Sequence, residues 1–428
     1  MSRFALRLLS LMMIIALIAA CQPAAAPTAA PAPSGGQSAP AAQGSECKIT
    51  FGAAVSLTGK TAKEGGYVKD GYELFKDEVN KAGGFQVGDK KCLIDIKYYD
   101  DASDPDTSAQ LVEKLVTEDK VDLLLGPYGT NPTFSASAIA EKYEIPMIEG
   151  GGAGLKIFNR GYNYIFGTLP AAPNYLRSVI DATLAKDPSV KTVAILVEND
   201  GFSLEVADGA EAYAKEKGLD VVYKEQYPSN TQDVSSLITA VKAKNPDMIL
   251  GAGHAADAIL IMKGLKDQKV NAKTYAFSVG PTSPDFRKTL EKDADYVLGI
   301  GPWTEAMKFK GSDVFGTAQN FADMMRAKYG ADTYKTVPYQ AASAAAALLS
   351  YQKAIESAGT IEAKAVRDAL SKLDFQSFYG DVKFTPEGII VKPMGVVQLN
   401  PDGNTYTVYP PDAANGEFLY PAKPWDQR

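Results

Sequence analysis

The stretch that most constrains the fold runs from Val121 to Gly154 and carries two short apolar segments that each end in glycines. Val121–Leu125 is a nearly continuous apolar run, as expected of a parallel strand that is covered on both faces. Thr130 then suits the cap of a helix that opens at Asn131, and Ile145–Ile148 reads as a second strand. The pattern predicts a β-α-β unit.

Both strands of this unit end in open loops at one edge of the predicted sheet. Gly126–Gly129 follows the first strand, and Glu149 leads into Gly150–Gly154 after the second. Open α/β sheets bind small ligands at the carboxyl ends of their strands. Because these loops are poor in side chains, we expect bare backbone N–H groups there. With a helix N-terminus behind them, they suit an anionic group such as a carboxylate.

The β-α-β pattern occurs in two halves of the chain, which predicts an α/β fold with two doubly wound, Rossmann-like lobes. Residues 46–167 supply a first lobe, and residues 168–299 repeat the pattern in a second. Residues 300–380 are mainly helical and lack enough strands of their own, so we expect them to pack back onto the first lobe. Residues 381–428 read as a C-terminal segment that belongs mainly to the second lobe. These crossings between lobes predict a hinge.

The beginning of the chain does not read as part of the fold. Residues 1–21 combine two arginines with a short apolar core, which predicts a signal peptide. Small residues before Cys21 resemble the lipobox of bacterial lipoproteins, in which Cys21 becomes the lipidated N-terminus. An ordinary secretory peptide with an incidental cysteine is the alternative. Residues 22–45, rich in Ala and Pro, predict a disordered tether. We expect an exported lipoprotein on the outer side of the cytoplasmic membrane, in a periplasm or at a cell surface.

Two further cysteines, Cys47 and Cys92, each start an apolar run. If those runs are adjacent parallel strands, the two cysteines lie side by side at the strand starts. Export favours oxidation, so we expect a Cys47–Cys92 disulfide. Two independent buried thiols are the alternative.

A set of short motifs occurs in a fixed order between Cys47 and Val408: Ser56–Gly59, Asp70-Gly71, Tyr99–Asp101, Gly126–Gly129, Pro338–Ala342 and Phe378–Gly380. Together they resemble the leucine/isoleucine/valine-binding proteins of bacterial ABC transporters, which are type I periplasmic binding proteins. The resemblance implies two lobes joined by three crossovers, with the ligand between them. It also implies capture by hinge closure, delivery to membrane permease subunits, and the same disulfide.

The resemblance further assigns one end of a ligand site. In the family, an amino acid carboxylate is held by the loop that here contains Gly129 and Thr130, and Thr130 keeps the hydroxyl chemistry. The next loop supplies a small residue and a threonine, at positions that match Gly151 and Ala153. A tyrosine of the second lobe matches Phe202, which keeps the aromatic ring.

The other end of the site departs from the family pattern. The acid that pairs with the ligand ammonium group falls near Gly280, and Glu64 falls where the first lobe usually presents an aromatic ring. His254, the only histidine, matches a tyrosine contact. Tyr128 and Trp303, which lie close to glycines, are expected to line the cleft. An α-amino acid, another small carboxylate, an aromatic acid and an amide all remain open as ligands.

The sequence favours a binding protein over an enzyme. It has no GxSxG elbow, no HExxH motif and one histidine, so neither catalysis nor a metal site is expected. Gly251–Ala256 fits the GxGxxA pattern, but the next strand ends without an acid to hold a ribose, so no nucleotide or other cofactor is expected. A net charge of -7 gives no reason to expect nucleic acid as a partner. The alternative function is a ligand-sensing receptor module with the same fold.

Overall fold

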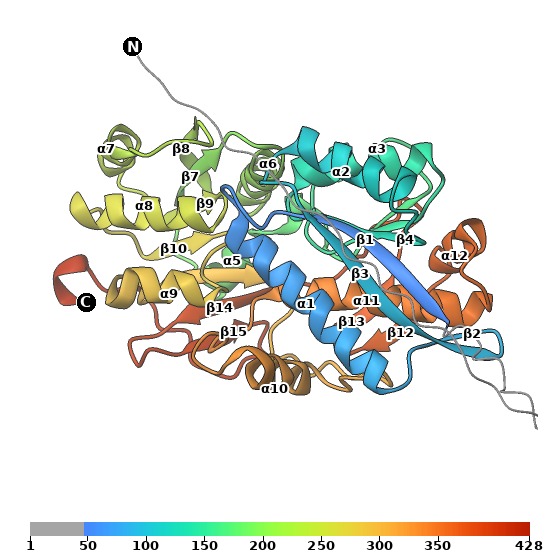
Figure 1. Cartoon of the computed structure of the whole chain (residues 1–428). Coiled ribbons are helices and arrows are strands. Elements are labelled where there is room, and N and C mark those ends of the chain that lie inside the picture. The colour runs from blue at the N-terminus through green and yellow to red at the C-terminus, as the bar shows by residue number, and fades with distance from the viewer. Residues whose placement is uncertain (1–46) are drawn as a thin grey trace, which may run out of the picture. The chain divides into compact units, whose positions relative to one another are not determined.

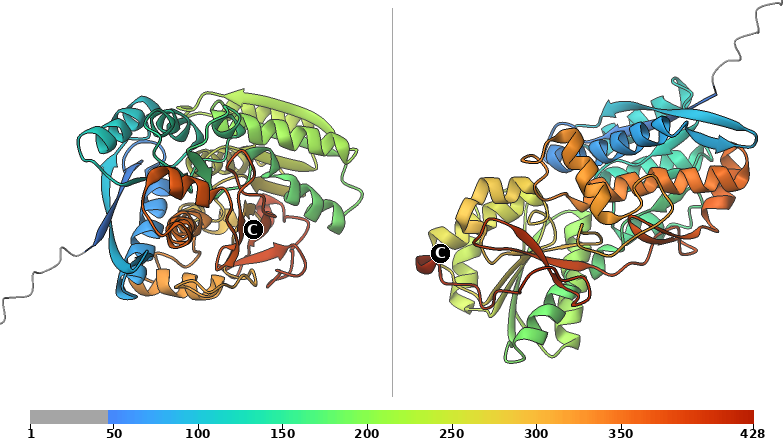
Figure 2. Two further views of the ribbon diagram at one scale, coloured as in Figure 1. Left: turned by 90° about the vertical axis from the view of Figure 1, so that its right-hand side faces the viewer. Right: turned by 90° about the horizontal axis from the view of Figure 1, so that it is seen from below.

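A computed structural model of the chain describes residues 47–428, which form one compact unit. Two open sheets, each covered by helices, make up two lobes of this unit (Figures 1 and 2). The expected signal peptide, Cys21 and the tether lie outside the described residues. Within residues 47–428, no helix combines the length and the apolar character that a membrane span requires.

The first lobe is built on a six-stranded sheet with the order β2-β3-β1-β4-β5-β6. All neighbours except β2 and β3 pair in parallel. The strands are β1 (Lys48–Val55), β2 (Phe85–Val87), β3 (Lys90–Asp100), β4 (Leu123–Leu125), β5 (Met147–Glu149) and β6 (Ile165–Gly167). The helices that join them are α1 (Ala62–Lys81), α2 (Pro105–Thr117), α3 (Thr130–Lys142) and α4 (Leu155–Phe158).

The second lobe is built on a seven-stranded sheet with the order β15-β14-β11-β10-β9-β7-β8. Its strands are β7 (Thr192–Glu198), β8 (Asp220–Tyr227), β9 (Met248–Ala252), β10 (Thr274–Phe277), β11 (Leu298–Gly301), β14 (Gly395–Leu399) and β15 (Thr405–Tyr409). Its helices are α5 (Arg177–Lys186), α6 (Gly201–Glu216), α7 (Ser235–Lys244), α8 (Ala255–Asp267) and α9 (Pro284–Leu290), with short 3₁₀ turns η1 (Ala172–Asn174), η2 (Glu291–Ala294) and η3 (Trp425–Gln427).

The chain returns to the first lobe after β11, through α10 (Ala318–Tyr329), α11 (Tyr339–Ala358) and α12 (Ala363–Leu370). The Tyr351 hydroxyl on α11 donates to the carbonyl oxygens of Leu124 and Pro146, at 2.8 and 2.6 Å. At the crossing of α1 and α11, a Cβ on Gly71 would lie 2.1 Å from the Ala341 oxygen. Only glycine permits this close approach, so α11 packs directly on α1 and the first sheet.

Three segments connect the two lobes. The chain passes from β6 to β7, from β11 to α10, and from the hairpin of β12 (Asp374–Ser377) and β13 (Gly380–Lys383) to β14. Two of the crossings pair with each other, since the Gly167 N–H donates to Gly388 at 2.8 Å and the Ile390 N–H donates to Gly167 at 3.1 Å. This three-crossover connection is the geometry of a hinge.

The expected disulfide is confirmed between Cys47 and Cys92. It joins the starts of β1 and β3, which are adjacent and parallel, with Lys48 opposite Leu93. Strand β2, which pairs antiparallel with the start of β3, was not predicted from the sequence. The predicted cap of α3 is wrong by one residue. Thr130 is the first helical residue, and Gly129 precedes it with a φ of 93° that glycine adopts readily.

Candidate functional site

The two glycine loops of the first lobe lie against each other where β4 and β5 end. The Gly129 N–H donates to the Gly151 oxygen at 3.0 Å, and the Gly154 N–H donates to the Thr130 hydroxyl at 3.0 Å. Thr130 begins α3, so its own N–H and that of Asn131 have no acceptor within the helix. These donors, with the proton of the Thr130 hydroxyl, form an anion-binding corner.

The second glycine loop is organised by a buried carboxyl group. Oε2 of Glu149 accepts the N–H groups of Gly151, at 2.7 Å, and Gly152. The expectation of bare N–H groups in this loop is therefore wrong, because Glu149 and Thr130 already accept three of them. Burial raises the pKa of Glu149 to about 8, although both backbone hydrogen bonds oppose the shift. Thus Glu149 fixes the shape of the loop and is not free to contact a ligand.

A small cavity between the lobes lies next to this corner, with a volume of about 10 Å³. A space of this size holds about one water molecule, so entry of a larger solute requires the lobes to separate. Seven of the predicted site residues line the cavity: Tyr128, Gly129, Thr130, Gly151, Ala153, Phe202 and His254. Leu169, Tyr175 and Tyr339 complete it.

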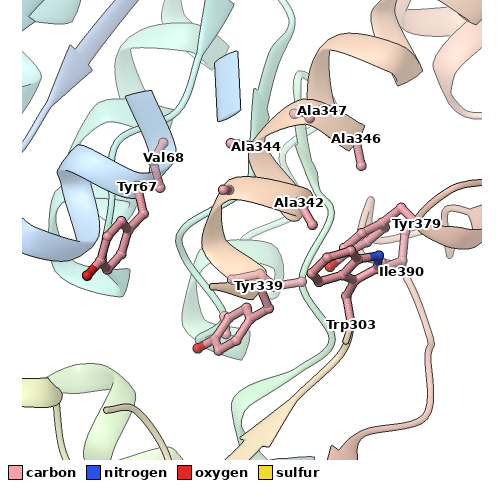
Figure 3. Close-up of a cluster of buried hydrophobic side chains, with 14 of the residues drawn as sticks. Tyr67, Val68, Trp303, Tyr339, Ala342, Ala344, Ala346, Ala347, Tyr379 and Ile390 are labelled. Atoms are coloured by element: carbon pink, nitrogen blue, oxygen red, sulfur yellow. The ribbon is translucent and has the colours of Figure 1, made fainter. Parts of the chain in front are cut away.

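Five of the ten residues that line the cavity carry aromatic rings. Tyr175 packs edge-on against Phe202, with centroids 5.1 Å apart, and Phe202 lies 5.6 Å from the His254 ring. The Tyr175 hydroxyl is buried and has no hydrogen-bond partner among the described residues. Tyr339 extends from the first turn of α11 (Figure 3). The cavity therefore offers a largely apolar wall with one unused hydroxyl beside the anion-binding corner.

His254 connects the cavity to an acidic region of the second lobe. The Tyr128 hydroxyl lies 3.2 Å from Nδ1 of His254, and Oδ2 of Asp200 lies 3.6 Å from Nε2. Burial lowers the pKa of His254, but the carboxylates around it, Asp200 first and then Glu198, outweigh burial and raise the pKa above its usual value. The carboxylates thus shift the His254 ring toward its protonated form relative to a free histidine.

The acidic region holds three carboxylates. Glu198 ends β7, Asp200 caps the start of α6, and Asp257 lies in the first turn of α8. Lys60, from the loop after β1, reaches across the cleft and pairs with Glu198 and Asp257. A wider cavity of about 230 Å³ lies here, lined by Lys60, Glu198 and Asp200 together with Tyr128, Thr130 and His254. This cluster was not predicted from the sequence, although Glu198 ends β7 and Asp200 lies two residues further on.

Three predicted site residues lie outside both cavities. The Glu64 carboxylate is buried and accepts the Ala255 N–H at 3.2 Å. Gly280 forms a turn with a φ of 116° against Phe286 and Ala258. Trp303 lies in the buried cluster drawn in Figure 3, where its indole N–H donates to the Phe378 oxygen at 3.1 Å.

A larger cavity, about 550 Å³, lies elsewhere between the lobes, against α1 and α9. Its walls include Tyr67, whose hydroxyl donates to Asp285 at 2.6 Å, and Lys335. The first residues of α1 and α9, Ala62 and Pro284, line it, but it lacks the paired glycine loops that follow β4 and β5. We therefore place the candidate site at the smaller cavity, where chemistry suited to a ligand converges.

Comparison with known proteins agrees with this architecture. Residues 48–404 match the model of a family described as periplasmic binding protein. A Leu/Ile/Val-binding protein homolog of Brucella abortus is 30% identical over 286 residues, which span 61% of this chain and 70% of the relative. A second Brucella abortus homolog is 24% identical over 87% of this chain and 94% of its own length.

Solved structures share the same fold. A branched-chain amino acid binding protein of Streptococcus pneumoniae, solved with isoleucine, superposes with a TM-score of 0.73 at 22% identity, covering 87% of this chain and 100% of its own. A solute-binding protein of R. palustris, solved with benzoate, superposes with a TM-score of 0.71 at 17% identity. The match covers 84% of this chain and 95% of the R. palustris chain.

The chain belongs to the periplasmic binding protein family, in the type I branch of the Leu/Ile/Val-binding proteins. It is a solute-binding protein that works outside the cytoplasm, and not an enzyme.

Proposed function

We propose that the protein captures a small carboxylate, an amino acid or a related compound, between its lobes and delivers it to the permease subunits of an ABC importer. The observation that carries the proposal is the anion-binding corner at Thr130, which opens onto an aromatic-walled cavity at the lobe interface. Contacts with the ligand are assigned to Gly129, Thr130, Tyr128, Phe202 and His254. The cleft opens at the hinge, admits the ligand and closes over it.

An aromatic acid is the second candidate for the ligand. Tyr175, Phe202 and Tyr339 offer ring faces and edges to an aromatic solute. The R. palustris relative solved with benzoate binds a ligand of this class.

We further propose a lobe division that follows the sequence analysis, with residues 46–167 and 300–380 in the first lobe and residues 168–299 and most of 381–428 in the second. Residues 1–21 act as a lipoprotein signal peptide, Cys21 carries the lipid, and residues 22–45 tether the binding unit to the membrane. Mass spectrometry of the protein recovered from membranes tests this proposal, because a diacylated Cys21 adds the mass of the lipid to the first peptide.

A thermal-shift panel tests the ligand class. Leucine, isoleucine, phenylalanine and benzoate are compared with leucinamide and benzamide, which lack the carboxylate. A ligand at a hundred times its dissociation constant stabilises the folded protein by about 2.7 kcal/mol. We expect at least one acid to raise Tm and its amide to raise it much less. Equal shifts from an acid and its amide would contradict the carboxylate assignment.

Replacing Thr130 with valine is expected to weaken binding of the carboxylate about tenfold to a hundredfold. The substitution removes the hydroxyl that donates to the ligand and leaves the Gly154 N–H without its acceptor. Thr130→Ser keeps the hydroxyl and is the matched control, with an expected affinity within about threefold of the wild type. Isothermal titration with the acid selected by the panel measures both. Similar affinities for valine and serine variants would remove Thr130 from the site.

A further inference from the structure

The Lys60 ammonium group has three acceptors on the second lobe. It donates to the Ser229 carbonyl oxygen at 2.7 Å, to Oε1 of Glu198, and to Asp257, whose Oδ1 lies at 3.2 Å. A primary ammonium group has three N–H donors, so this set satisfies it completely. Lys60 itself belongs to the first lobe and reaches the set from the loop between β1 and α1.

Two of the three acceptors, Asp257 and Ser229, make hydrogen bonds within the second lobe that do not involve Lys60. Glu198 ends β7, and its side chain is 2% exposed. Asp257 lies in the first turn of α8, where its Oδ2 accepts a hydrogen bond from the backbone N–H of His254 at 3.2 Å. Ser229 follows β8, and its hydroxyl donates to the Asn199 oxygen at 3.1 Å. The second lobe therefore fixes two of the acceptors by its own hydrogen bonds and Glu198 by its position at the buried end of β7.

The site holds more negative than positive charge. Four buried or nearly buried carboxylates, those of Glu64, Glu198, Asp200 and Asp257, surround two basic groups, Lys60 and His254. Oε2 of Glu198 is buried and has no hydrogen-bond partner among the described residues. Burial and the nearby Asp200 and Asp257 raise the pKa of Glu198, although His254 opposes the shift. A cationic group within the acceptor set therefore stabilises this arrangement.

A hydrogen-bonding cation suits the site better than a metal ion. Single atoms of Glu198, Asp200 and His254 lie within 4.8 Å of one another, which is close enough for shared ligation. However, Asp200 already accepts the N–H groups of Phe202 and Ser203 at the start of α6. A metal also requires neutral His254, whereas the surrounding carboxylates favour the protonated ring.

The acceptor set opens onto the ligand site. Glu198 and Ser229 of the acceptor set line the same 230 Å³ cavity as Thr130 and His254 of the ligand site. We infer that Glu198, Asp257 and the Ser229 carbonyl form a receptor for a primary ammonium group, which Lys60 fills in this structure and from which the ammonium group of a bound ligand displaces it. The last step rests on the proposed function, whereas the receptor itself does not. The receptor supplies the ammonium partner that Gly280 lacks.

Chemical rescue tests the receptor without knowledge of the ligand. Lys60→Ala removes the resident ammonium group, and methylammonium chloride is then added to the protein. We expect a saturable rise in Tm of about 2 °C at ten times the dissociation constant of methylammonium. Methylammonium should give no saturable rise in Tm with the wild type or with Lys60→Ala/Glu198→Gln. Tetramethylammonium, which has no N–H donor, should give none with Lys60→Ala. The inference would be overturned if Tm rose equally in all samples, or if methylammonium left the Tm of Lys60→Ala unchanged. A saturable rise in the Tm of Lys60→Ala with Zn²⁺, and none with methylammonium, would also overturn it.

A pair of ligands tests the displacement step. Leucine and 4-methylpentanoate share the carboxylate and side chain, but only leucine has an ammonium group. We expect Lys60→Ala to bind leucine about tenfold more tightly and Glu198→Gln about tenfold more weakly, with 4-methylpentanoate changed less than threefold in both. Equal weakening of both ligands by Lys60→Ala would show that Lys60 only holds the lobes together, and would overturn displacement. If wild type binds neither ligand, the amino acid class fails, and the rescue result still decides whether the receptor exists.

Discussion

Replacing Glu149 with glutamine is expected to stabilise the protein by about 4 to 5 kcal/mol at pH 8 and to change its stability little at pH 4.5. The pKa of Glu149 is about 8 in the folded protein, against 4.5 for an unperturbed side chain. A raised pKa stabilises the fold below pH 4.5, and this contribution is lost progressively as pH rises from 4.5 to 8, because the unfolded chain ionises first. Glutamine does not titrate, so the variant should lack this slope.

The reason lies in the surroundings of Glu149. A Cβ on Gly126 would lie 2.2 Å from that of Glu149, and a Cβ on Gly167 would lie 2.5 Å from Oε1. The carboxyl group therefore sits in a closely fitted space, where Oε1 has no hydrogen-bond partner among the described residues. Glutamine is close to glutamic acid in size, and we expect its carbonyl oxygen to accept the N–H groups of Gly151 and Gly152 in place of Oε2.

Urea unfolding at pH 4.5, 6 and 8 measures the difference between wild type and variant. Glu118→Gln, at an exposed position, is the matched control and should follow the wild type at each pH. A constant difference between Glu149→Gln and wild type across the three pH values would mean that Glu149 is ionised in the fold.

Removal of the disulfide is expected to cost about 4 kcal/mol of unfolding free energy. Cys47 and Cys92 are 45 residues apart. Closing a loop of this length lowers the entropy of the unfolded chain, which raises the free energy of the unfolded state by about 4 kcal/mol at 25 °C. The double variant Cys47→Ser/Cys92→Ser should keep the fold, because the backbone N–H of Leu93 still donates to the backbone carbonyl oxygen of residue 47. It should unfold at a lower denaturant concentration.

Guanidinium unfolding of oxidised wild type, wild type with reductant, and the double variant measures this effect. The reduced wild type and the variant should agree within about 1 kcal/mol. If reductant leaves the midpoint of the wild type unchanged while the variant is destabilised, the loss comes from the serines and not from the crosslink.

The sequence predicted the sheets well because buried parallel strands are continuous apolar runs. Leu123–Leu125 and Met147–Glu149 lie within or next to the two segments that the pattern marked. Short elements were harder, since Phe85–Val87 has three residues and too few positions to show a period. Helix α3 begins one residue earlier than predicted. The Thr130 hydroxyl accepts a hydrogen bond from the Gly154 N–H and does not cap its own helix.

The candidate site was predicted in part. Residues at the ends of β4 and β5 come together because neighbouring parallel strands place their loops at one edge. The contact of Lys60 with Glu198 joins positions 138 residues apart on different lobes, and no local pattern indicates it. Tyr175 and Tyr339 enter the cavity from a crossover and from the start of α11, so their place depended on how the lobes meet.

The position of the ligand site is decided by a crystal structure of the protein with the acid that raises Tm most. We expect ligand density between the lobes, with the carboxylate within hydrogen-bonding distance of the Thr130 hydroxyl and the α3 N-terminus, and the remainder against Tyr175 and Phe202. Density in the 550 Å³ cavity beside Tyr67 and Lys335, with the Thr130 corner free of ligand, would contradict it.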